Sequence, residues 1–412
     1  MNFFLPPAKA SFSWWKAVLP PTGKVDFPSV VADFLGAPKV MVGDAWVNVL
    51  AEGFKRLAMG DKRKKIVLPG YSCNEFVKAI LLADLEPLFI DLDEEGKIQT
   101  TVLASLDKTE ILGLLAVTTS GVVSPLSALK DWCIANNCFM VEDAGYTFLG
   151  EDESGKKYGS FGHVAIVNMS EGKIIPCGGA AWVINESALA DRWDDIGQKV
   201  AETAPVSNFR ESLRLLVYQL GSSKWGYHFY HQLRMLGLKD WKSKFTSEPS
   251  RMGENYATGN LEWKDNRIVM DEEQHDQLKK ILIRPWNRVR QQCALQILKD
   301  RKKLMKERKR LVELYRKLLE FPALELPQNA MPVRLPILLN VPLDSPEIIK
   351  NLASGGIKKQ YPPSWPMYQL PLPNSQKYYR EAFSLPLHHS VSDSDIRKIV
   401  KQVSPYRSET FA

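Results

Sequence analysis

Carboxylates and a lysine, residue types that can take part in catalysis, follow two predicted strands. The apolar run 138–141 leads directly into Glu142 and Asp143, and a second apolar run, 163–167, is followed by Lys173. A lysine amine can attack a carbonyl carbon, and a carboxylate can pair with a protonated ring nitrogen. Because the carboxyl ends of neighbouring parallel strands meet at one edge of a sheet, the spacing predicts a site between Asp143 and Lys173.

The elements that must position these residues alternate along the chain. Helices are predicted at 74–83 and 127–136, and strands at 65–69, 87–91, 111–117, 139–141, 163–167 and 180–184. Strands and helices that alternate with short connections indicate βαβ units and a mostly parallel α/β sheet. Tyr71, Asp143 and Lys173 all fall at carboxyl ends of these strands, so the pattern places them at the same edge.

Length and composition indicate a globular chain of more than one domain. The 412 residues can bury a large core, and 45% hydrophobic and 25% charged residues are ordinary for a soluble protein. The five cysteines form no CxxC pair, which argues against disulfides or a metal site and fits a reducing compartment. A proline-interrupted N-terminus is a poor signal peptide, and the uncharged run 111–129 is too polar for a transmembrane segment. We therefore expect a cytoplasmic protein.

The net charge of +7 is concentrated in residues 284–317, where leucines recur at helical spacing. The simplest interpretation is a long amphipathic helix with a solvated basic face. The alternative is a surface that attracts an anionic partner, such as a nucleotide diphosphate or a membrane. No aromatic-interleaved basic patch accompanies the charge, so nucleic acid is not an expected partner.

The order of several motifs resembles the DegT/DnrJ/EryC1/StrS family of sugar aminotransferases, which are fold-type I enzymes that use pyridoxal 5'-phosphate (PLP). The motifs are LPGYS at 68–72, PLFIDLD at 87–93, Glu142-Asp143-Ala144, Lys173, Gly178-Gly179, Gly356-Ile357, Tyr361-Pro362-Pro363 and LPLH at 385–388. The resemblance covers residues 35–403 and fades between 200 and 280. It implies a large domain with a mostly parallel seven-stranded sheet, a smaller α+β C-terminal domain and a homodimer.

The resemblance also implies roles for the two central residues. Lys173 would bind PLP covalently and move a proton between substrate and cofactor, and Asp143 would pair with the pyridinium nitrogen. Taken by themselves, Lys173 could be a surface lysine and Asp143 the N-cap of a following helix. The dehydratase branch of the family has histidine in place of the lysine, so Lys173 favours an aminotransferase.

Two further parts of the expected cofactor site depart from the family pattern. The turn at Asp44 and Ala45 precedes a helix whose N-terminal amides, those of Ala45 and Trp46, would hold the cofactor phosphate. Asp44 stands where a hydroxyl residue is usual, and its carboxylate is unfavourable there unless it points away and caps the helix. Cys73 occupies the usual aromatic position over the ring, so either Tyr71 covers the ring or Cys73 is a small substitute.

Other candidate residues keep two interpretations each. Tyr146 stands where the family has glutamine near the phenolic oxygen of the cofactor, and a core or lid tyrosine is equally open. Asn168 and Ser170 precede the lysine where a phosphate-binding serine is expected, and each is equally open to a structural role. His163 is interpreted first as a strand-edge histidine and second as a ligand. Trp365 lies in a segment that lacks the family's substrate-facing histidine.

The expected organisation has four parts: an N-terminal arm at 1–30, a large PLP-binding domain at 31–202, a divergent helical insertion at 203–282, and a long helix with the small domain at 283–412. Within the insertion, 213–220 and 227–236 have a helical rhythm. They indicate an extra helical layer or dimer surface, with a substrate lid or a membrane contact as alternatives. The resemblance also implies an asparagine that contacts the cofactor phosphate of the neighbouring subunit, and either Asn255 or Asn287 could be this residue.

Residues and resemblance together predict a PLP-dependent aminotransferase. It would take an amino group from a donor, by family analogy glutamate, and pass it to a keto sugar, expected to be nucleotide-linked, for polysaccharide or glycoconjugate synthesis. The altered positions leave an alternative open, a degenerate PLP-fold protein that binds or scaffolds without transamination. A third hypothesis, a membrane-peripheral assembly protein, rests on the aromatic segment after residue 203.

Overall fold

The computed structural model describes residues 5–6, 12–13, 15, 26–170, 172–235, 261–264, 267–342, 345–361 and 363–407. Its centre is a seven-stranded sheet of order β1-β7-β6-β5-β4-β2-β3. The strands are β1 (Lys39–Gly43), β2 (Lys65–Pro69), β3 (Glu86–Ile90), β4 (Ile111–Ala116), β5 (Phe139–Asp143), β6 (Val164–Asn168) and β7 (Ala180–Ile184). Strands β2 to β6 are parallel, whereas β7 and β1 pair antiparallel. The predicted α/β class and the seven-stranded sheet are confirmed.

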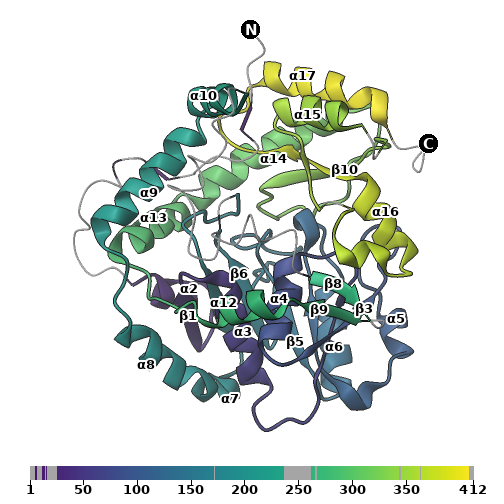
Figure 1. The fold of residues 1–412 in the computed structure, drawn as a ribbon. Helices are drawn as coiled ribbons and strands as arrows, with labels where there is room; N and C mark the ends of the chain where they lie inside the picture. Colours follow the sequence, from purple (N-terminus) through teal and green to yellow (C-terminus); the bar gives the residue numbers. More distant parts are fainter. Residues whose placement is uncertain are drawn as a thin grey trace.

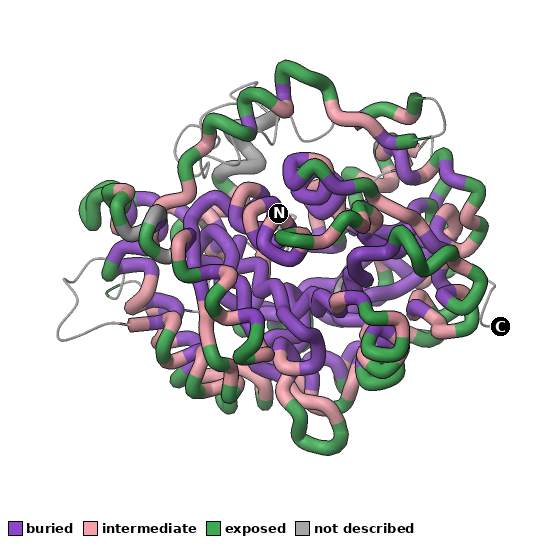
Figure 2. Tube along the Cα trace, turned by 90° about the horizontal axis from the view of Figure 1, so that it is seen from below, coloured by how far each residue is buried: buried purple, intermediate pink, exposed green. Residues whose placement is uncertain are grey.

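Helices cover both faces of this sheet, which explains why its strands are apolar throughout (Figure 1). On β6, Val164 and Ile166 belong to one core, while Ala165 and Val167 belong to the other. The first core includes residues of α3 (Trp46–Leu57), α4 (Asn74–Leu82), α5 (Thr100–Ala104) and α6 (Leu126–Ala135). The second includes residues of α2 (Phe27–Leu35) and α13 (Arg288–Lys299). Figure 2 shows the buried segments gathered at the centre of the molecule.

The C-terminal part forms a smaller α+β layer. Strands β10 (Arg334–Leu338), β12 (Ala382–Pro386) and β11 (Lys358–Lys359) pair in that order as an antiparallel sheet. The helices around this sheet are α14 (Arg301–Leu318), α15 (Pro346–Ser354), α16 (Pro373–Glu381) and α17 (Asp393–Val403). Leu311 and Tyr315 of α14 pack with Ile337 and Phe383 in one core.

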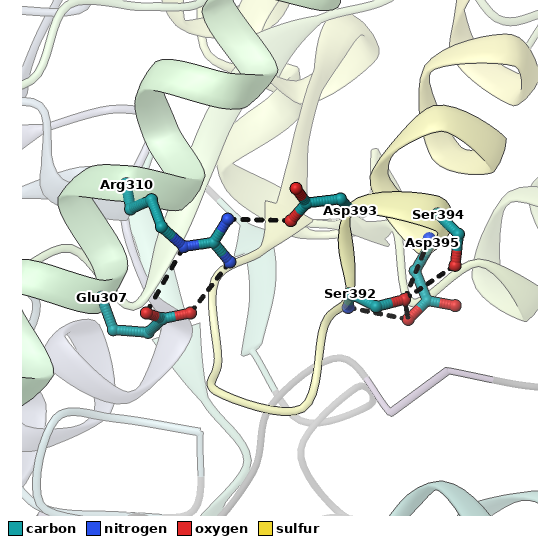
Figure 3. A network of polar contacts seen from close by, with 6 residues as sticks. All are labelled: Glu307, Arg310, Ser392, Asp393, Ser394 and Asp395. Atoms are coloured by element: carbon teal, nitrogen blue, oxygen red, sulfur yellow. Dashed lines mark hydrogen bonds and ion pairs between the residues drawn. The ribbon is translucent and has the colours of Figure 1, made fainter.

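A polar network fastens α17 to α14 at the surface (Figure 3). Arg310 of α14 donates to Asp393 at 2.8 Å and to Glu307 at 3.0 Å. Ser392 and Asp395 form the capping box that begins α17; the sequence leaves the N-cap open between Ser392 and Asp393, and the structure has Ser392. Because the ion pairs are exposed, their contribution to stability is small, and the cap fixes the start of the helix.

The prediction of a single helix over residues 284–317 is wrong in one respect. Two helices, α13 and α14, meet at Asp300, which ends the first and begins the second. Aspartate favours helix ends over helix interiors because its side chain competes for backbone groups. Most basic side chains of α14 are solvated as expected, but Arg308 of α14 and Arg290 of α13 are buried.

The segment predicted as a helical insertion is partly helical. It contains α9 (Asn208–Gly221), α10 (Lys224–Met235) and α12 (Glu272–Lys279), preceded by α7 (Ser187–Ala190) and α8 (Asp194–Glu202). A two-stranded hairpin, β8 (Leu261–Lys264) with β9 (Arg267–Met270), was not expected. Asn255 and the end of the predicted helical run 227–236 lie outside the described residues. Across the part of the chain that is described, no helix combines the length and the apolar character needed to cross a bilayer.

The first carboxylate of β5, Glu142, has a structural role. It is fully buried and accepts backbone N–H groups from Gly159 at 2.6 Å, Phe161 at 2.8 Å and Gly162 at 3.3 Å. Burial raises the pKa of Glu142 to about 7, although these three hydrogen bonds oppose the shift. The side chain therefore holds the loop that leads from β5 to β6.

Replacing Glu142 by glutamine is expected to lower the free energy of unfolding by about 2 kcal/mol, because an amide NH2 then faces backbone donors. The folded pKa lies above the ordinary value, so the stability linked to the neutral acid is present below pH 4.5 and is lost as the pH rises through about 7. Urea unfolding at pH 5 and pH 8 checks both points. The gap between wild type and variant should be larger at pH 5, and an equal gap would contradict the raised pKa.

Candidate active site

Asp143 is the last residue of β5 and is 4% exposed. Its Oδ1 accepts the N–H of Gly145 at 2.9 Å, so the side chain bends into the turn that follows the strand. A Cβ at Gly145 would lie 3.0 Å from that oxygen and 3.3 Å from the Cβ of Asn168, so a side chain there would crowd both groups. A turn and not a helix follows, so the N-cap interpretation of Asp143 is wrong.

Lys173 lies in the loop after β6 and is half-buried. Its Nζ is 3.4 Å from the centroid of the Tyr146 ring, a cation–π contact. Burial raises the pKa of Asp143, while the positive charge of Lys173 lowers it, so the carboxylate and the ammonium lie within electrostatic reach. The structure thus brings together Asp143, Tyr146 and Lys173 at the carboxyl edge of the sheet.

The hydroxyl of Tyr146 connects this group to the small domain. Gln360 donates from Nε2 to the tyrosine oxygen at 3.0 Å. Burial by itself would raise the pKa of Tyr146, but the charges of Lys173, Lys358 and Arg334, with the Gln360 hydrogen bond, lower it. Tyr146 is therefore buried at the junction of the two domains and faces several cations.

The turn before α3 is built differently from the sequence expectation. The N–H of Asp44 donates to the carbonyl of Arg284 at 3.1 Å, and Oδ1 of Asp44 accepts the N–H of Arg284 at 2.8 Å. Ala45 is the N-cap of α3 and no side chain caps the helix. The suggestion that Asp44 caps the helix is therefore wrong. Its carboxylate joins the strand end to the segment before α13.

The glycine pair after Lys173 packs against the same turn. A Cβ on Gly179 would lie 2.0 Å from the carbonyl oxygen of Gly43, and its φ of +79° also favours glycine. The loop carrying Lys173 is thereby held next to the N-terminus of α3. Backbone amides and the helix dipole favour an anion at this helix end.

Tyr71 follows β2 and is 1% exposed among tyrosines of the small domain. Its ring centroid lies 5.0 Å from that of Tyr361, 5.4 Å from Tyr378 and 4.9 Å from Tyr379. Within the described part of the chain its hydroxyl has no hydrogen-bond partner, although it is buried. Such a group costs free energy unless a ligand supplies the missing partner.

Cys73 also lies near the lysine. Its thiol bonds to the carboxylate of Glu75, and burial together with Glu75 raises the pKa of the thiol, while the charge of Lys173 opposes this shift. Tyr71 and Cys73 therefore both remain candidates for the residue that covers the face of the cofactor ring.

The remaining candidate residues lie in three places: the lysine loop, the start of β6 and the tyrosine cluster. Oδ1 of Asn168 accepts the N–H of Ser170 at 2.9 Å, and the carbonyl of Ser170 accepts the N–H of Lys173 at 3.2 Å. These two residues therefore shape the lysine loop. Nδ1 of His163 accepts the N–H of Met140 at 2.8 Å at the opposite end of β6, so the strand-edge interpretation of this histidine is confirmed. Trp365 stacks on Tyr361 at 4.8 Å, beside the tyrosine cluster.

Sequence reasoning missed the support that α9 gives to the lysine loop. The hydroxyl of Tyr218 accepts the N–H of Gly172 at 3.3 Å, and Arg214 donates from Nη2 to the carbonyl of Cys177 at 2.6 Å. The only sequence signal was a glutamate three residues before an arginine, at the start of the predicted helical run 213–220. Asn287 also has a local role, since it caps α13 by accepting the N–H of Arg290 and donates to the carbonyl of Val206.

Arg214 is fixed by a buried ion-pair triad. Glu211 is 1% exposed and lies 2.6 Å from Arg214 and 2.9 Å from Arg290 of α13. Burial opposes ionisation, but the two arginine charges hold the pKa of Glu211 below its ordinary value. The triad ties α9 and α13 to the loop that carries Lys173.

Replacing Glu211 by glutamine is expected to cost about 3 kcal/mol, because two buried guanidinium groups lose their counter-charge. The folded pKa is depressed, so this stability is present above the ordinary pKa of 4.5 and is lost as the pH falls through the folded value. Thermal unfolding between pH 3 and pH 7 checks it. The variant should show less acid sensitivity than wild type, and a parallel pH profile would contradict the assignment.

Comparison with known proteins agrees with this geometry. Residues 24–214 match the model of the DegT/DnrJ/EryC1/StrS aminotransferase family. Over these residues the predicted resemblance to the family is confirmed, and with it the predicted class of enzyme, a PLP-dependent aminotransferase.

Solved structures with the same fold cover nearly the whole chain. One is the Helicobacter pylori aminotransferase PseC of pseudaminic acid biosynthesis, with 17% identity, a TM-score of 0.68, and 97% of this chain and 98% of that chain covered. A second is the E. coli GDP-4-keto-6-deoxy-D-mannose-3-dehydratase with hydrated PLP, at 11% identity, a TM-score of 0.64, and 97% and 99% coverage. A third is DesI in the presence of its TDP-sugar product, at 14% identity, a TM-score of 0.63, and 98% and 93% coverage. These likenesses confirm the fold.

The residues at the site fit PLP, the predicted cofactor, which the family match supports. They supply an amine at Lys173, a buried carboxylate at Asp143 and the buried hydroxyl of Tyr71 that lacks a partner among the described residues. The N-terminus of α3 adds a place for an anion.

Proposed function

Because residues 24–214 match the DegT/DnrJ/EryC1/StrS aminotransferase family, we propose that this chain transfers an amino group from glutamate to a nucleotide-linked keto sugar, for polysaccharide or glycoconjugate synthesis. The observation that carries the proposal is the position of the Lys173 ammonium, 3.4 Å over the ring of Tyr146 and within electrostatic reach of the buried Asp143. An amine and a carboxylate so placed are what amino-group transfer with PLP requires.

The substrate class is supported by proteins of the same fold. DesI was solved with a TDP-sugar product, and PseC acts in the synthesis of pseudaminic acid. The dehydratase of the same fold shows that the fold by itself does not fix the reaction. Lys173 is the local feature that favours amino transfer, because the resemblance places a histidine there in the dehydratase branch.

Each residue of the site has one proposed task. Lys173 would hold PLP and, once released, carry a proton to and from the substrate carbon. Asp143 would bind the ring nitrogen, and the amides of Ala45 and Trp46 at the start of α3 would bind the phosphate. When bound, PLP supplies a ring that withdraws electrons from the carbon bearing the amino group. Tyr71 and Tyr361 exclude water from this side of the site.

Location and assembly belong to the same proposal. We place the protein in the cytoplasm, where its five cysteines, all described as free thiols, would remain reduced. A homodimer is supported by exposed apolar side chains on α9 and α10, where Phe209 is 81%, Trp225 76% and Phe229 59% exposed. Light scattering of the PLP-loaded protein tests the dimer, and a monomer that binds lipid vesicles would favour the membrane-peripheral alternative.

The test of function uses the visible absorption band of the PLP-loaded protein. Glutamate is expected to bleach the band, and a nucleotide-linked keto sugar added afterwards should restore it. A stable band that glutamate never changes would overturn the proposal and favour the alternative of a PLP-fold scaffold. Bleaching by glutamate with restoration only by a keto acid would keep the donor and overturn the sugar acceptor.

A further inference from the structure

The small sheet turns one polar face toward the large domain. In β10 and β12, Leu335, Ile337 and Phe383 pack into the core with α14 and α17. Strand side chains alternate, so Arg334 and Ser384 lie on the opposite face. Lys358 of β11 pairs with Ser384 and shares that face.

Arg334 on this face is a buried cation that has no ionic partner among the described residues. It is 4% exposed, and Nη1 donates to Oγ of Ser384 at 3.3 Å. Among the described residues no carboxylate forms an ion pair with its guanidinium, and the groups that act on it electrostatically are the phenols of Tyr146, Tyr218 and Tyr227. By contrast, the buried guanidinium groups of Arg214 and Arg290 each form an ion pair with Glu211.

Arg334 lies within electrostatic reach of Tyr146, a residue of the lysine site. Gln360, two residues after Lys358 and on the same face, donates to the hydroxyl of Tyr146 at 3.0 Å. The ammonium of Lys173 lies over the face of the Tyr146 ring in a cation–π contact. The positive charge of Arg334 lowers the pKa of the same tyrosine. The small-domain sheet thus presents Arg334 to the reaction site across Tyr146.

We propose that Arg334 binds the carboxylate of the amino donor, with Ser384 orienting its guanidinium. This inference rests on the proposed function. The carboxylate of an amino acid is attached to the carbon that bears the amino group, so it must lie close to Lys173. A planar guanidinium suits a carboxylate, and the bound anion offsets the cost of burying the charge. The diphosphate of a nucleotide sugar lies beyond the sugar ring, several bonds from the reacting carbon.

Calorimetric titration of the PLP-loaded protein with glutarate, a dicarboxylate without an amino group, tests binding directly. Arg334→Gln is expected to weaken glutarate binding about 30- to 100-fold, the range of a lost charge-assisted pair. Arg308→Gln is the matched control, because Arg308 is equally buried and, within the described part of the chain, donates only to the carbonyl of Met331 at 3.4 Å. Its affinity for glutarate should stay within about twofold of wild type.

Stability separates a binding role from a structural one. Ligand-free Arg334→Gln should unfold at the same temperature as wild type or higher, because a buried unpaired charge is removed. A lower unfolding temperature with unchanged glutarate affinity would make Arg334 structural and overturn the proposal. Loss of UDP binding with unchanged glutarate binding would overturn it as well, by moving the anion site to the acceptor.

The failure of this inference differs from the failure of the proposed function. If glutamate bleaches the visible band of wild type and of Arg334→Gln at the same concentration, amino transfer stands and the Arg334 assignment is overturned. If glutamate never bleaches the band but glutarate binding depends on Arg334, the carboxylate site stands and the transferase proposal fails. If glutarate does not bind wild type, the assignment of Arg334 is overturned.

Discussion

Replacing Lys173 by alanine is expected to lower aminotransferase turnover by about 10⁴-fold, the upper end of what a positioned proton carrier contributes. The variant loses the amine that would hold PLP and the base that would move the proton. Borohydride treatment of the PLP-loaded wild type should leave a pyridoxyl group on the protein, whereas the variant should carry none. Mass spectrometry of the intact chain and steady-state kinetics provide the two measurements.

Lys62→Ala is the control for this experiment, because Lys62 is an exposed lysine before β2, away from the site. It should retain the pyridoxyl label and wild-type turnover. Circular dichroism should show that Lys173→Ala is folded, since the half-buried lysine makes no ion pair within the described residues. A label on another lysine with full activity would disprove the assignment of Lys173.

Replacing Asp143 by asparagine is expected to lower kcat by about 10³-fold, an electrostatic loss of the size seen when one preorganised group is removed. Asparagine keeps an oxygen that can accept the N–H of Gly145, so the turn should survive. Burial raises the pKa of Asp143, which shows that its charge is costly in the folded protein. The variant should therefore unfold within about 1 kcal/mol of wild type.

Kinetics and urea unfolding on the same preparations separate these effects. Asp152→Asn, in an exposed turn of the same β5–β6 connection, is the matched control and should leave kcat unchanged. Glu142→Gln gives the opposite pattern, with lost stability and retained kcat per folded molecule. If Asp143→Asn kept full kcat, the pairing of Asp143 with the cofactor ring would be wrong.

The amino-acid sequence by itself determined the order of strands and helices in the large sheet and the edge of that sheet that carries Asp143 and Lys173. The strands from β2 to β7 begin and end within two residues of the predicted bounds, because continuous apolar runs between turn residues admit few other structures. The position of the site followed from parallel strands, whose carboxyl ends share one edge.

Only the tertiary structure decided how the distant segments complete the site. Asp44 bonds to the backbone of Arg284, Tyr218 and Arg214 hold the lysine loop from α9, and Arg334 arrives from the small sheet. None of these contacts has a local sequence period, because each joins residues far apart in the chain. The sequence pattern shows which residues face a core, whereas the partner of a buried polar group depends on how the domains pack.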